Sequence, residues 1–344
     1  MIYLDYAATN PFTKYPCSKY SSFLNPNANY AYKEQKLLED CANRVKAAIG
    51  AKNGKVAFGG TSSQLIENLF TRASDESNEY LTICSKYEHD SMWRFADQWS
   101  NIDSLRYDIQ TYSGDKQLFI CLMGVNNITG EIMPVEEIGR LCHKHGAFFI
   151  CDMTAQIGKA LIPVNIDQWC DCAVWSGHKL GTEGGIGAMW LSDKFNEWLG
   201  DFNLHGTPNL AGAMAIADAT DNACKSSMKH YIAMYMYLYN KLVNANIQFQ
   251  VINGSVKTCA INAIMFDDIN ADSLQQYLAS KQIYIGIGGS ACSSLHDFRV
   301  LNAYGLTNDE ASRVVRVSFG DETTEYDIDE FVNGVIEYRE KFVR

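Results

Sequence analysis

The tetrapeptide Ser176-Gly177-His178-Lys179 places a lysine at the end of a predicted buried strand. The apolar run at residues 172–175 comes directly before it and has the length of such a strand. Partial burial at a strand end lowers the pKa of a lysine, which makes its amine a nucleophile suited to Schiff-base chemistry. The alternative is a surface lysine in a loop, and the tetrapeptide by itself leaves both interpretations open.

Two further groups of polar residues follow predicted strands and suit the binding of a cofactor. Asp152 comes directly after the apolar run 147–151. A carboxylate there can cap a helix, form an ion pair, bind a metal or keep a pyridine ring protonated, as enzymes that use pyridoxal phosphate require. The Gly-Thr-Ser-Ser turn at residues 60–63 offers backbone N–H groups and hydroxyls to a phosphate. Because Asp152 and Lys179 follow successive strands, their combination favours a site that brackets a cofactor ring.

The elements around these residues alternate between predicted strands and helices. Residues 33–49 carry apolar side chains at steps of three and four and are followed by Gly50, which predicts an amphipathic helix. A second helical pattern covers residues 135–143. Short apolar runs predict strands at 55–58, 117–125, 147–151, 172–175 and 187–191. Alternating strands and helices indicate an α/β fold, with an open parallel sheet that is covered on both faces and binds ligands at the carboxyl ends of its strands.

The last third of the chain has a different pattern. A long helical stretch at about residues 211–245 precedes shorter strands at 249–252 and 260–266, which predicts a smaller α+β unit. A Gly- and Ser-rich cluster at residues 286–294 interrupts this unit, and we expect a mobile loop that carries Cys292. The expected organisation is a large domain of residues 14–245 and a small domain formed by residues 1–13 and 246–344.

Composition excludes several classes of protein. The 29 Lys and Arg residues against 40 Asp and Glu give a net charge of −11, and an acidic surface repels nucleic acid. No stretch approaches the roughly 18 to 20 apolar residues of a membrane span, and the start of the chain does not have the pattern of a signal peptide. The 11 cysteines are an odd number without a CxxC pair, so neither a disulfide framework nor a structural metal site is expected. We therefore predict a cytoplasmic protein without a membrane or nucleic-acid partner.

A series of short motifs resembles the cysteine desulfurase family of the class V aminotransferases, which are dimeric pyridoxal phosphate enzymes of fold type I. The opening residues 3–11, Tyr-Leu-Asp-Tyr-Ala-Ala-Thr-Asn-Pro, are similar to the first motif of that family. The other matches follow in the family's order: Asn25-Pro26, Glu88-His89, Val125-Asn126-Asn127 with Gly130, Asp152, Ser176-Gly177-His178-Lys179, Gly206-Thr207, Gly289-Ser290-Ala291-Cys292 and Val315-Arg316-Val317-Ser318. The match runs from about residue 2 to residue 330. It implies a large domain with a mainly parallel sheet, a smaller α+β domain, pyridoxal 5′-phosphate and a homodimer.

The resemblance also implies a role for each matching residue on the cofactor side. Lys179 would bind the cofactor covalently and move the Cα proton of the substrate. Asp152 would keep the ring nitrogen protonated, and His89 would stack on the ring and assist proton transfer. The remaining cofactor contacts that the resemblance implies are Ser62, Ser63, Ser176 and His178 at the phosphate, Thr207 reaching the phosphate from the other subunit, and Asn127 near the phenolic oxygen.

On the substrate side, the resemblance implies that Arg316 binds the carboxylate of L-cysteine, with Asn127 and Ala7 beside it. The Cys292 thiolate would attack the substrate sulfur, which leaves L-alanine and a persulfide that passes to an acceptor protein. Each of the other ten cysteines is expected to be an inert buried thiol. The motifs identify neither the sulfur acceptor nor the destination of the sulfur, such as iron–sulfur clusters, thiolated RNA or modified DNA.

Four positions depart from the family's pattern. The glutamine that follows the ring aspartate by three residues is Ala155 here, and Gln156, one residue later, is the expected cofactor contact. The family usually has arginine, histidine and glutamate where this chain has Leu204, Tyr30 and Ile128. These changes touch substrate and cofactor contacts, so they bear on activity rather than on fold.

Two alternatives to a cysteine desulfurase therefore stay open. One is a selenocysteine lyase or another class V enzyme in which Cys292 is incidental, and the other is a paralogue that has lost catalysis and serves as a binding or scaffold protein. A persulfide on Cys292 after treatment with L-cysteine distinguishes a cysteine desulfurase from the first alternative. The absorption band of the lysine-bound cofactor distinguishes an enzyme from the second alternative, a paralogue without catalysis.

Overall fold

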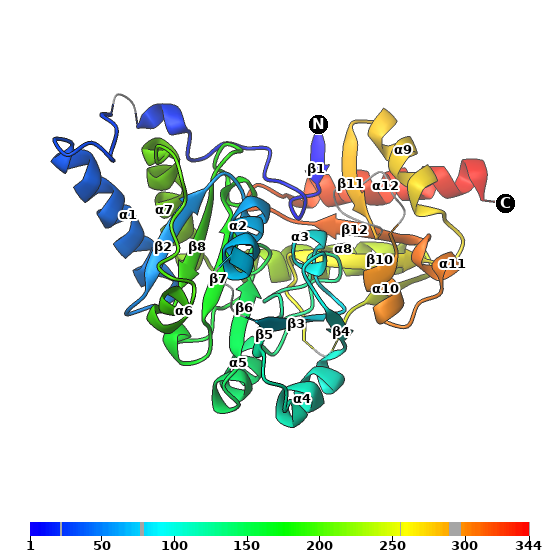
Figure 1. The fold of residues 1–344 in the computed structure, drawn as a ribbon. Coiled ribbons are helices and arrows are strands. Elements are labelled where there is room, and N and C mark those ends of the chain that lie inside the picture. Colours follow the sequence, from blue (N-terminus) through cyan, green and yellow to red (C-terminus); the bar gives the residue numbers. More distant parts are fainter. Residues whose placement is uncertain (21–22, 76–78, 255, 289–296, 344) are drawn as a thin grey trace. The chain divides into compact units, whose positions relative to one another are not determined.

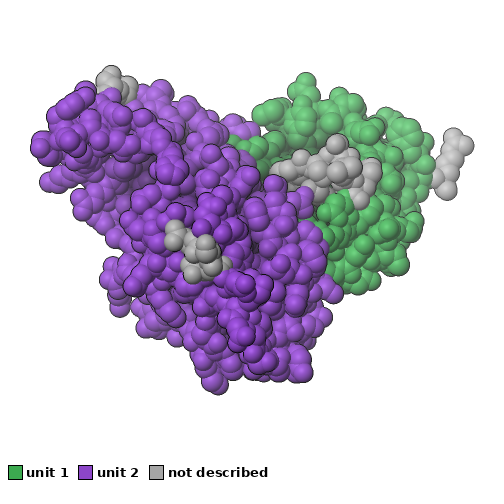
Figure 2. All heavy atoms as spheres, in the orientation of Figure 1, with its two compact units in different colours: residues 1–10, 125–132, 227–344 green, residues 11–124, 133–226 purple. Residues whose placement is uncertain are grey.

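The computed structural model describes residues 1–20, 23–75, 79–254, 256–288 and 297–343, and the chain divides into two compact units. Unit 1 comprises residues 1–10, 125–132 and 227–344, and unit 2 comprises residues 11–124 and 133–226 (Figure 2). The boundary therefore lies after residue 226 instead of the expected residue 245. The physical reason is that α8 (Lys229–Asn244) packs on α12 (Glu325–Phe342), where Tyr237 and Lys241 both bind Asp329.

Unit 2 contains a seven-stranded, mainly parallel sheet with the strand order β2-β8-β7-β6-β5-β3-β4 (Figure 1). Its strands are β2 (Lys55–Gly59), β3 (Tyr80–Ser85), β4 (Gln98–Ser100), β5 (Gln117–Cys121), β6 (Phe148–Asp152), β7 (Cys172–Ser176) and β8 (Gly187–Leu191). Among these strands, β8 alone runs in the direction opposite to the other six. The predicted α/β class is confirmed. The central strands are buried on both faces, as expected for a parallel sheet with helices on each side.

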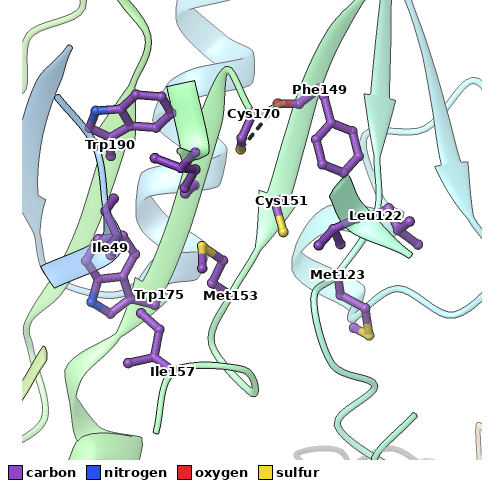
Figure 3. Packing of buried hydrophobic residues seen from close by; sticks show 14 of the residues in the cluster. Ile49, Leu122, Met123, Phe149, Cys151, Met153, Ile157, Cys170, Trp175 and Trp190 are labelled. Atoms are coloured by element: carbon purple, nitrogen blue, oxygen red, sulfur yellow. Dashed lines mark hydrogen bonds between the residues drawn. The ribbon is translucent and has the colours of Figure 1, made fainter. Parts of the chain in front are cut away.

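Helices cover both faces of this sheet. They are α1 (Tyr32–Ile49), α2 (Ser62–Asp75), α3 (Asp90–Trp93), α4 (Ile102–Thr111), α5 (Val135–Lys144), α6 (Asp193–Trp198) and α7 (Leu210–Lys225), with the short 3-10 helices η1 (Cys17–Lys19), η2 (Ile166–Gln168) and η3 (Gly177–Leu180). Side chains of α1, α4, α5 and α7 share one apolar cluster with one face of the strands, and those of α2, α3 and α6 share a second cluster with the other face. Figure 3 shows part of the first cluster around Trp175, Trp190 and Phe149.

Unit 1 contains a five-stranded mixed sheet with the order β1-β11-β12-β10-β9. Its strands are β1 (Ile2–Leu4), β9 (Phe249–Ile252), β10 (Ile261–Phe266), β11 (Ile283–Ile287) and β12 (Val314–Ser318). Its further helices are α9 (Ala271–Ser280), α10 (Arg299–Ala303) and α11 (Asn308–Ala311). The first strand of the chain pairs in parallel with β11, and the other neighbours pair antiparallel. The predicted smaller α+β architecture is therefore present.

Three expected elements need correction. The single helix predicted at 211–245 is wrong, because the chain leaves the helical conformation at Ser226 (φ −69°, ψ 145°) and separates α7 from α8. The strand predicted at 117–125 ends at Cys121. The predicted loop at 286–294 begins inside β11, and residues 289–296, with Cys292, lie outside the described residues. In the part of the chain that the structure describes, no helix is long and apolar enough to cross a membrane.

Candidate active site

Two adjacent parallel strands of unit 2 bring the predicted cofactor residues to one edge of the sheet. β6 ends at Asp152 and β7 ends at Ser176, and the two strands pair directly. Lys179 lies in η3, immediately after β7. The turn is tight, because a Cβ at Gly177 would lie 2.4 Å from the Thr182 hydroxyl oxygen. The structure thus confirms that Asp152 and Ser176 end neighbouring strands, with Lys179 directly beyond the second.

Asp152 is held as a buried carboxylate. Asp152 is 7% exposed, and its Oδ1 accepts a hydrogen bond from the backbone N–H of Thr154 at 2.8 Å. The following residue, Met153, donates its N–H to the carbonyl of Val174 on β7 at 2.9 Å, which ties the carboxylate to the neighbouring strand. A buried carboxylate in a fixed position is suited to pair with a cationic group.

Two serine hydroxyls meet where α2 begins. The backbone N–H of Ser62 donates to Ser176 Oγ at 3.1 Å, and the two hydroxyl oxygens are also 3.1 Å apart. β8 passes close to this point, since a Cβ at Gly187 would lie 2.9 Å from the Ser62 nitrogen. The first turn of α2 carries no acidic residue, and Ser63 is exposed beside the pair. The positive end of a helix with hydroxyls at hand is a site for an anion.

Positive charge gathers around His178. Its pKa is lowered to about 4 by burial, then by the charge of Lys179 and then by that of Lys159. His178 is therefore neutral at neutral pH and acts there as a hydrogen-bonding group. Lys159 is only 6% exposed, and the sequence analysis missed it because a single lysine in a loop gives no signal of burial. Two lysines near a neutral histidine favour an anionic ligand.

His89 is held by the short helix that follows it. Its Nδ1 accepts the backbone N–H of Ser91 at 3.2 Å and lies 2.9 Å from the Ser91 hydroxyl. Because a backbone N–H can only donate, the neutral ring carries its proton on Nε2. The adjacent Glu88 is fully buried, and its Oε1 accepts from the Ser85 hydroxyl at 2.6 Å and from Met123 N–H at 2.8 Å. Glu88 therefore fixes the segment that presents His89, a function that the sequence did not reveal.

The loop after β6 holds Gln156, the predicted cofactor contact. Its Nε2 donates to the carbonyl of Leu161 at 3.0 Å, and a Cβ at Gly124 would lie 1.9 Å from its Oε1. Within the described residues, Gln156 Oε1 and Thr154 Oγ1 are buried atoms without a hydrogen-bond partner. Contact between Gln156 and a cofactor stays a prediction, to which these two atoms contribute hydrogen-bonding capacity that no described residue uses.

Thr207 lies on an exposed loop that contacts another predicted motif. Asn25 Nδ2 donates to Thr207 Oγ1 at 3.5 Å, and Asn27 Nδ2 donates to the carbonyl of Gly206 at 3.0 Å. The second motif of the sequence and the Gly-Thr motif therefore lie together in one chain. Contact of Thr207 with a second subunit stays a prediction.

Unit 1 brings together the residues predicted to bind the substrate. Arg316 is 0% exposed, its Nη2 lies 2.7 Å from Asp5 Oδ1, and its Nη1 donates to the carbonyl of Asn127 at 3.0 Å. Ala7 N–H donates to the hydroxyl of Ser318, two residues after Arg316 on β12, at 2.8 Å. The sequence analysis missed Asp5 as a partner of this group. Nothing in an isolated Leu-Asp-Tyr segment indicates which cation the aspartate binds.

The positions that depart from the family's pattern have ordinary surroundings. Ile128 packs in an apolar cluster of unit 1 with Val314, and Leu204 packs against the second cluster of unit 2. Tyr30 is exposed and Ala155 is buried. Each side chain suits its local environment, so none of these changes disturbs the fold.

Ten cysteines fall within the described residues, and all of them are free thiols. Burial is the largest cause of a raised pKa for every one of them, as for Cys84 in β3 and Cys172 in β7. A thiol with a raised pKa is protonated at neutral pH and is a poor nucleophile. These ten cysteines are therefore suited to packing.

Comparisons with known proteins agree with the observed architecture. The sequence model of the class-V aminotransferases matches residues 2–331. The chain is 25% identical over 370 residues to the cysteine desulfurase IscS of Rickettsia felis, a match that covers 95% of this chain and 88% of that protein. It is 27% identical over 372 residues to a probable mitochondrial cysteine desulfurase of Dictyostelium discoideum, covering 95% and 80%. The solved structure of a NifS-like protein from Rickettsia africae matches with a TM-score of 0.83 at 19% identity, over 99% of each chain. The predicted fold type I is thereby confirmed, and the chain belongs to the class-V aminotransferase family.

Proposed function

We propose that the protein is a cysteine desulfurase dependent on pyridoxal 5′-phosphate, which converts L-cysteine to L-alanine and passes the sulfur through Cys292 to an acceptor protein. The observation that carries this proposal is the arrangement of Lys179 and Asp152 at the ends of adjacent strands, with Ser176 bound to Ser62 beside them. The relatives named cysteine desulfurases support it, because they match nearly the whole chain.

The residues of unit 2 fit the cofactor. Ser62, Ser176 and the start of α2 would hold its phosphate, and the charges of Lys159 and Lys179 add to the attraction. The buried carboxylate of Asp152 would bind the ring nitrogen. When bound, pyridoxal phosphate supplies an electron sink that stabilises negative charge developing at the substrate Cα. Gln156 Oε1 and Thr154 Oγ1 leave polar positions open in the loop after Asp152.

Protein side chains would then orient the substrate and move its protons. Arg316 binds the carboxylate of L-cysteine, with Asn127 and Ala7 next to it. Lys179 Nζ takes the proton from the substrate Cα and later returns a proton to the carbon skeleton. His89, which carries its proton on Nε2, would lie against the ring and supply that atom as a hydrogen-bond donor. His178, whose pKa burial and the charges of Lys179 and Lys159 lower in the protein alone, would donate a hydrogen bond to the phosphate.

The sulfur step requires a nucleophilic thiolate, which we assign to Cys292. Its sulfur attacks the sulfur of bound L-cysteine, so that an S–S bond forms while the C–S bond breaks. The electron pair of the broken bond stays on the carbon, which takes up a proton and becomes the methyl group of L-alanine. The raised thiol pKa values of the ten described cysteines support this choice, because those thiols stay protonated. The persulfide then passes to the acceptor protein.

The proposed enzyme works as a homodimer. Thr207 of each subunit serves the phosphate of the other subunit, which agrees with the exposure of Thr207 in the single chain. The hydrogen bond from Asn25 supports a defined orientation of its hydroxyl.

The test is the formation of L-alanine from L-cysteine by the pyridoxal phosphate-loaded protein in the presence of a thiol reductant. We expect alanine from the wild type and from Cys17→Ala, a half-buried cysteine that serves as the matched control, and none from Cys292→Ala. Absence of alanine from a protein that shows the cofactor band would refute the proposal and direct the search to selenocysteine or other amino acids. Absence of the band would favour the scaffold alternative.

A further inference from the structure

The ion pair between Asp5 and Arg316 joins the residue that follows β1 to β12 of the five-stranded sheet of unit 1. Figure 1 labels the strands of this sheet. Arg316 lies on β12 and pairs in register with Gly286 on β11 and Ala263 on β10, so its strand neighbours are the two smallest residue types. Asp5 follows β1, which pairs with the other side of β11. Its Oδ1 lies 2.7 Å from Arg316 Nη2. The pair therefore spans β11 without crossing a side chain at Gly286.

The guanidinium is fixed at two of its three nitrogens. Nη2 binds Asp5, and Nη1 donates to the carbonyl of Asn127 at 3.0 Å. Arg316 is 0% exposed, and its Nε is a buried donor without an acceptor among the residues that the structure describes. A buried N–H without an acceptor is costly, so this atom marks a position where an acceptor from a ligand fits.

Gly286 lies directly against the ion pair and has no side chain to disturb it. A Cβ at this residue would lie 2.8 Å from Asp5 Oδ1, 2.9 Å from Arg316 Nε and 3.0 Å from Nη2. These distances are too short for a carbon atom, so any side chain would displace the carboxylate, the guanidinium or both. The glycine thus preserves the ion pair and keeps a side chain of its own away from Nε.

We propose that Asp5 is a positioning residue that holds Arg316 by Nη2 and leaves its Nε–H for the carboxylate of the amino-acid substrate. The inference rests on the proposed function, in which Arg316 binds that carboxylate. A buried guanidinium needs a counter-charge before the substrate arrives, and Asp5 supplies it from one side. Because Asp5 uses Nη2 and leaves Nε open, the two carboxylates bind different nitrogens of one guanidinium.

Binding of L-alanine and of ethylamine to the pyridoxal phosphate-loaded protein tests this inference, with the cofactor absorption band as the readout. The two ligands share the amine, and only L-alanine has the carboxylate. The ratio of their dissociation constants therefore reports the carboxylate site alone and does not depend on Cys292. Arg316→Gln should reduce the wild-type preference for L-alanine to near unity.

We expect Asp5→Ala to reduce that preference by about tenfold or more, because a charge-assisted hydrogen bond no longer orients the guanidinium. Asp5→Asn keeps an acceptor oxygen and should retain the preference within about threefold. The KM for L-cysteine should rise in Asp5→Ala by a similar factor, with kcat changed much less. Asp268→Ala, which removes a surface ion pair with Arg339 in the same unit, is the matched control and should behave as wild type.

A wild-type preference in Asp5→Ala, together with its loss in Arg316→Gln, would overturn the inference. Should Asp5→Ala fail to fold, Asp5→Ser takes its place with the same expectation, because serine is too short to reach Nη2. A wild-type protein without a cofactor band would overturn both the proposed function and the inference. Failure of the sulfur step alone would leave the binding ratio intact, so the two failures are distinguishable.

Discussion

Burial and charge give two histidines of unit 2 opposite titration behaviour. Burial, Lys179 and Lys159 lower the pKa of His178 to about 4, whereas the hydrogen bond to Asp171 is the first cause of the raised pKa of His143. We predict that in the cofactor-free protein the ring signals of His178 stay constant from pH 8 to pH 6, while those of His143 titrate above the ordinary value of 6.5. Nuclear magnetic resonance, with assignments from His178→Gln and His143→Gln, measures both. Titration of His178 near pH 6.5 would contradict the proposed cluster of positive charge.

The His143–Asp171 pair also makes stability depend on pH. His143 Nε2 lies 2.9 Å from Asp171 Oδ2, and the folded-state pKa of His143 is raised. Its contribution to stability is therefore complete below pH 6.5, the unfolded value, and is lost as the pH rises through the folded value. The substitution His143→Gln lowers the free energy of unfolding, and this loss should be about 1 kcal/mol larger at pH 6 than at pH 8. Urea unfolding at the two pH values checks this, and an equal loss at both would contradict it.

Residue types at strand ends were predictable from the sequence, and buried charges were not. Asp152 and Lys179 follow apolar runs, so their position at one edge of the sheet follows from the topology of parallel strands. Glu88, Lys159 and Asp5 are polar residues that patterns of hydrophobicity assign to the surface. Their burial or pairing depends on contacts with residues far away in the sequence, such as Met123 for Glu88 and Arg316 for Asp5.

β8 passes close to the start of α2, where the proposed function places the phosphate. A Cβ at Gly187 would lie 2.8 Å from the Thr61 carbonyl carbon and 2.9 Å from the Ser62 nitrogen, and backbone cannot give way as a side chain can. We expect Gly187→Ala to cost about 1–3 kcal/mol of stability and to weaken pyridoxal phosphate binding by about tenfold. Gly184→Ala is the matched control, because a Cβ there meets nothing within 4 Å. Urea unfolding and cofactor titration measure the two effects, and equal behaviour of both variants would contradict the prediction.

Elements with a strong period were predictable, and their ends were not. The helix at 33–49 corresponds to α1 (Tyr32–Ile49), which ends at Gly50 with φ 75° as the capping glycine predicts. The apolar period continues through residues 211–245, yet Ser226 adopts an extended conformation and its hydroxyl binds the carbonyl of Asn222. A serine that bonds to the backbone competes with helix continuation, and hydrophobic periodicity does not report this competition.

At the scale of the whole molecule, the proposal requires two subunits per functional site. Thr207→Ala should weaken pyridoxal phosphate binding by about tenfold, and Lys179→Ala should lose the lysine-bound absorption band. A mixed dimer of the two variants should regain one site of wild-type affinity. In that site, Lys179 of the Thr207→Ala subunit and Thr207 of the Lys179→Ala subunit are both intact. Cofactor titration of purified mixed dimers checks this. Failure to regain affinity in a confirmed dimer would contradict the shared site.

The division into units was the least predictable feature of the chain. Residues 125–132 interrupt unit 2 and join unit 1, where Asn127 accepts from Arg316. This segment begins at Val125, the last residue of the strand predicted at 117–125, and three residues of unit 2 separate it from the end of β5. The segment joins unit 1 through long-range contacts, in which Arg316 binds Asn127 and Tyr304 binds Glu131. Local sequence patterns do not contain such contacts.

The central claim, that sulfur leaves L-cysteine as a persulfide on Cys292, is tested most directly by mass spectrometry. The pyridoxal phosphate-loaded protein is mixed with a small excess of L-cysteine, trapped with an alkylating agent and digested. We predict that the peptide containing Cys292 gains one sulfur atom in the wild type, and that no peptide gains it in Cys292→Ala. A persulfide on another cysteine, or L-alanine formed without any persulfide in the wild type, would contradict the account.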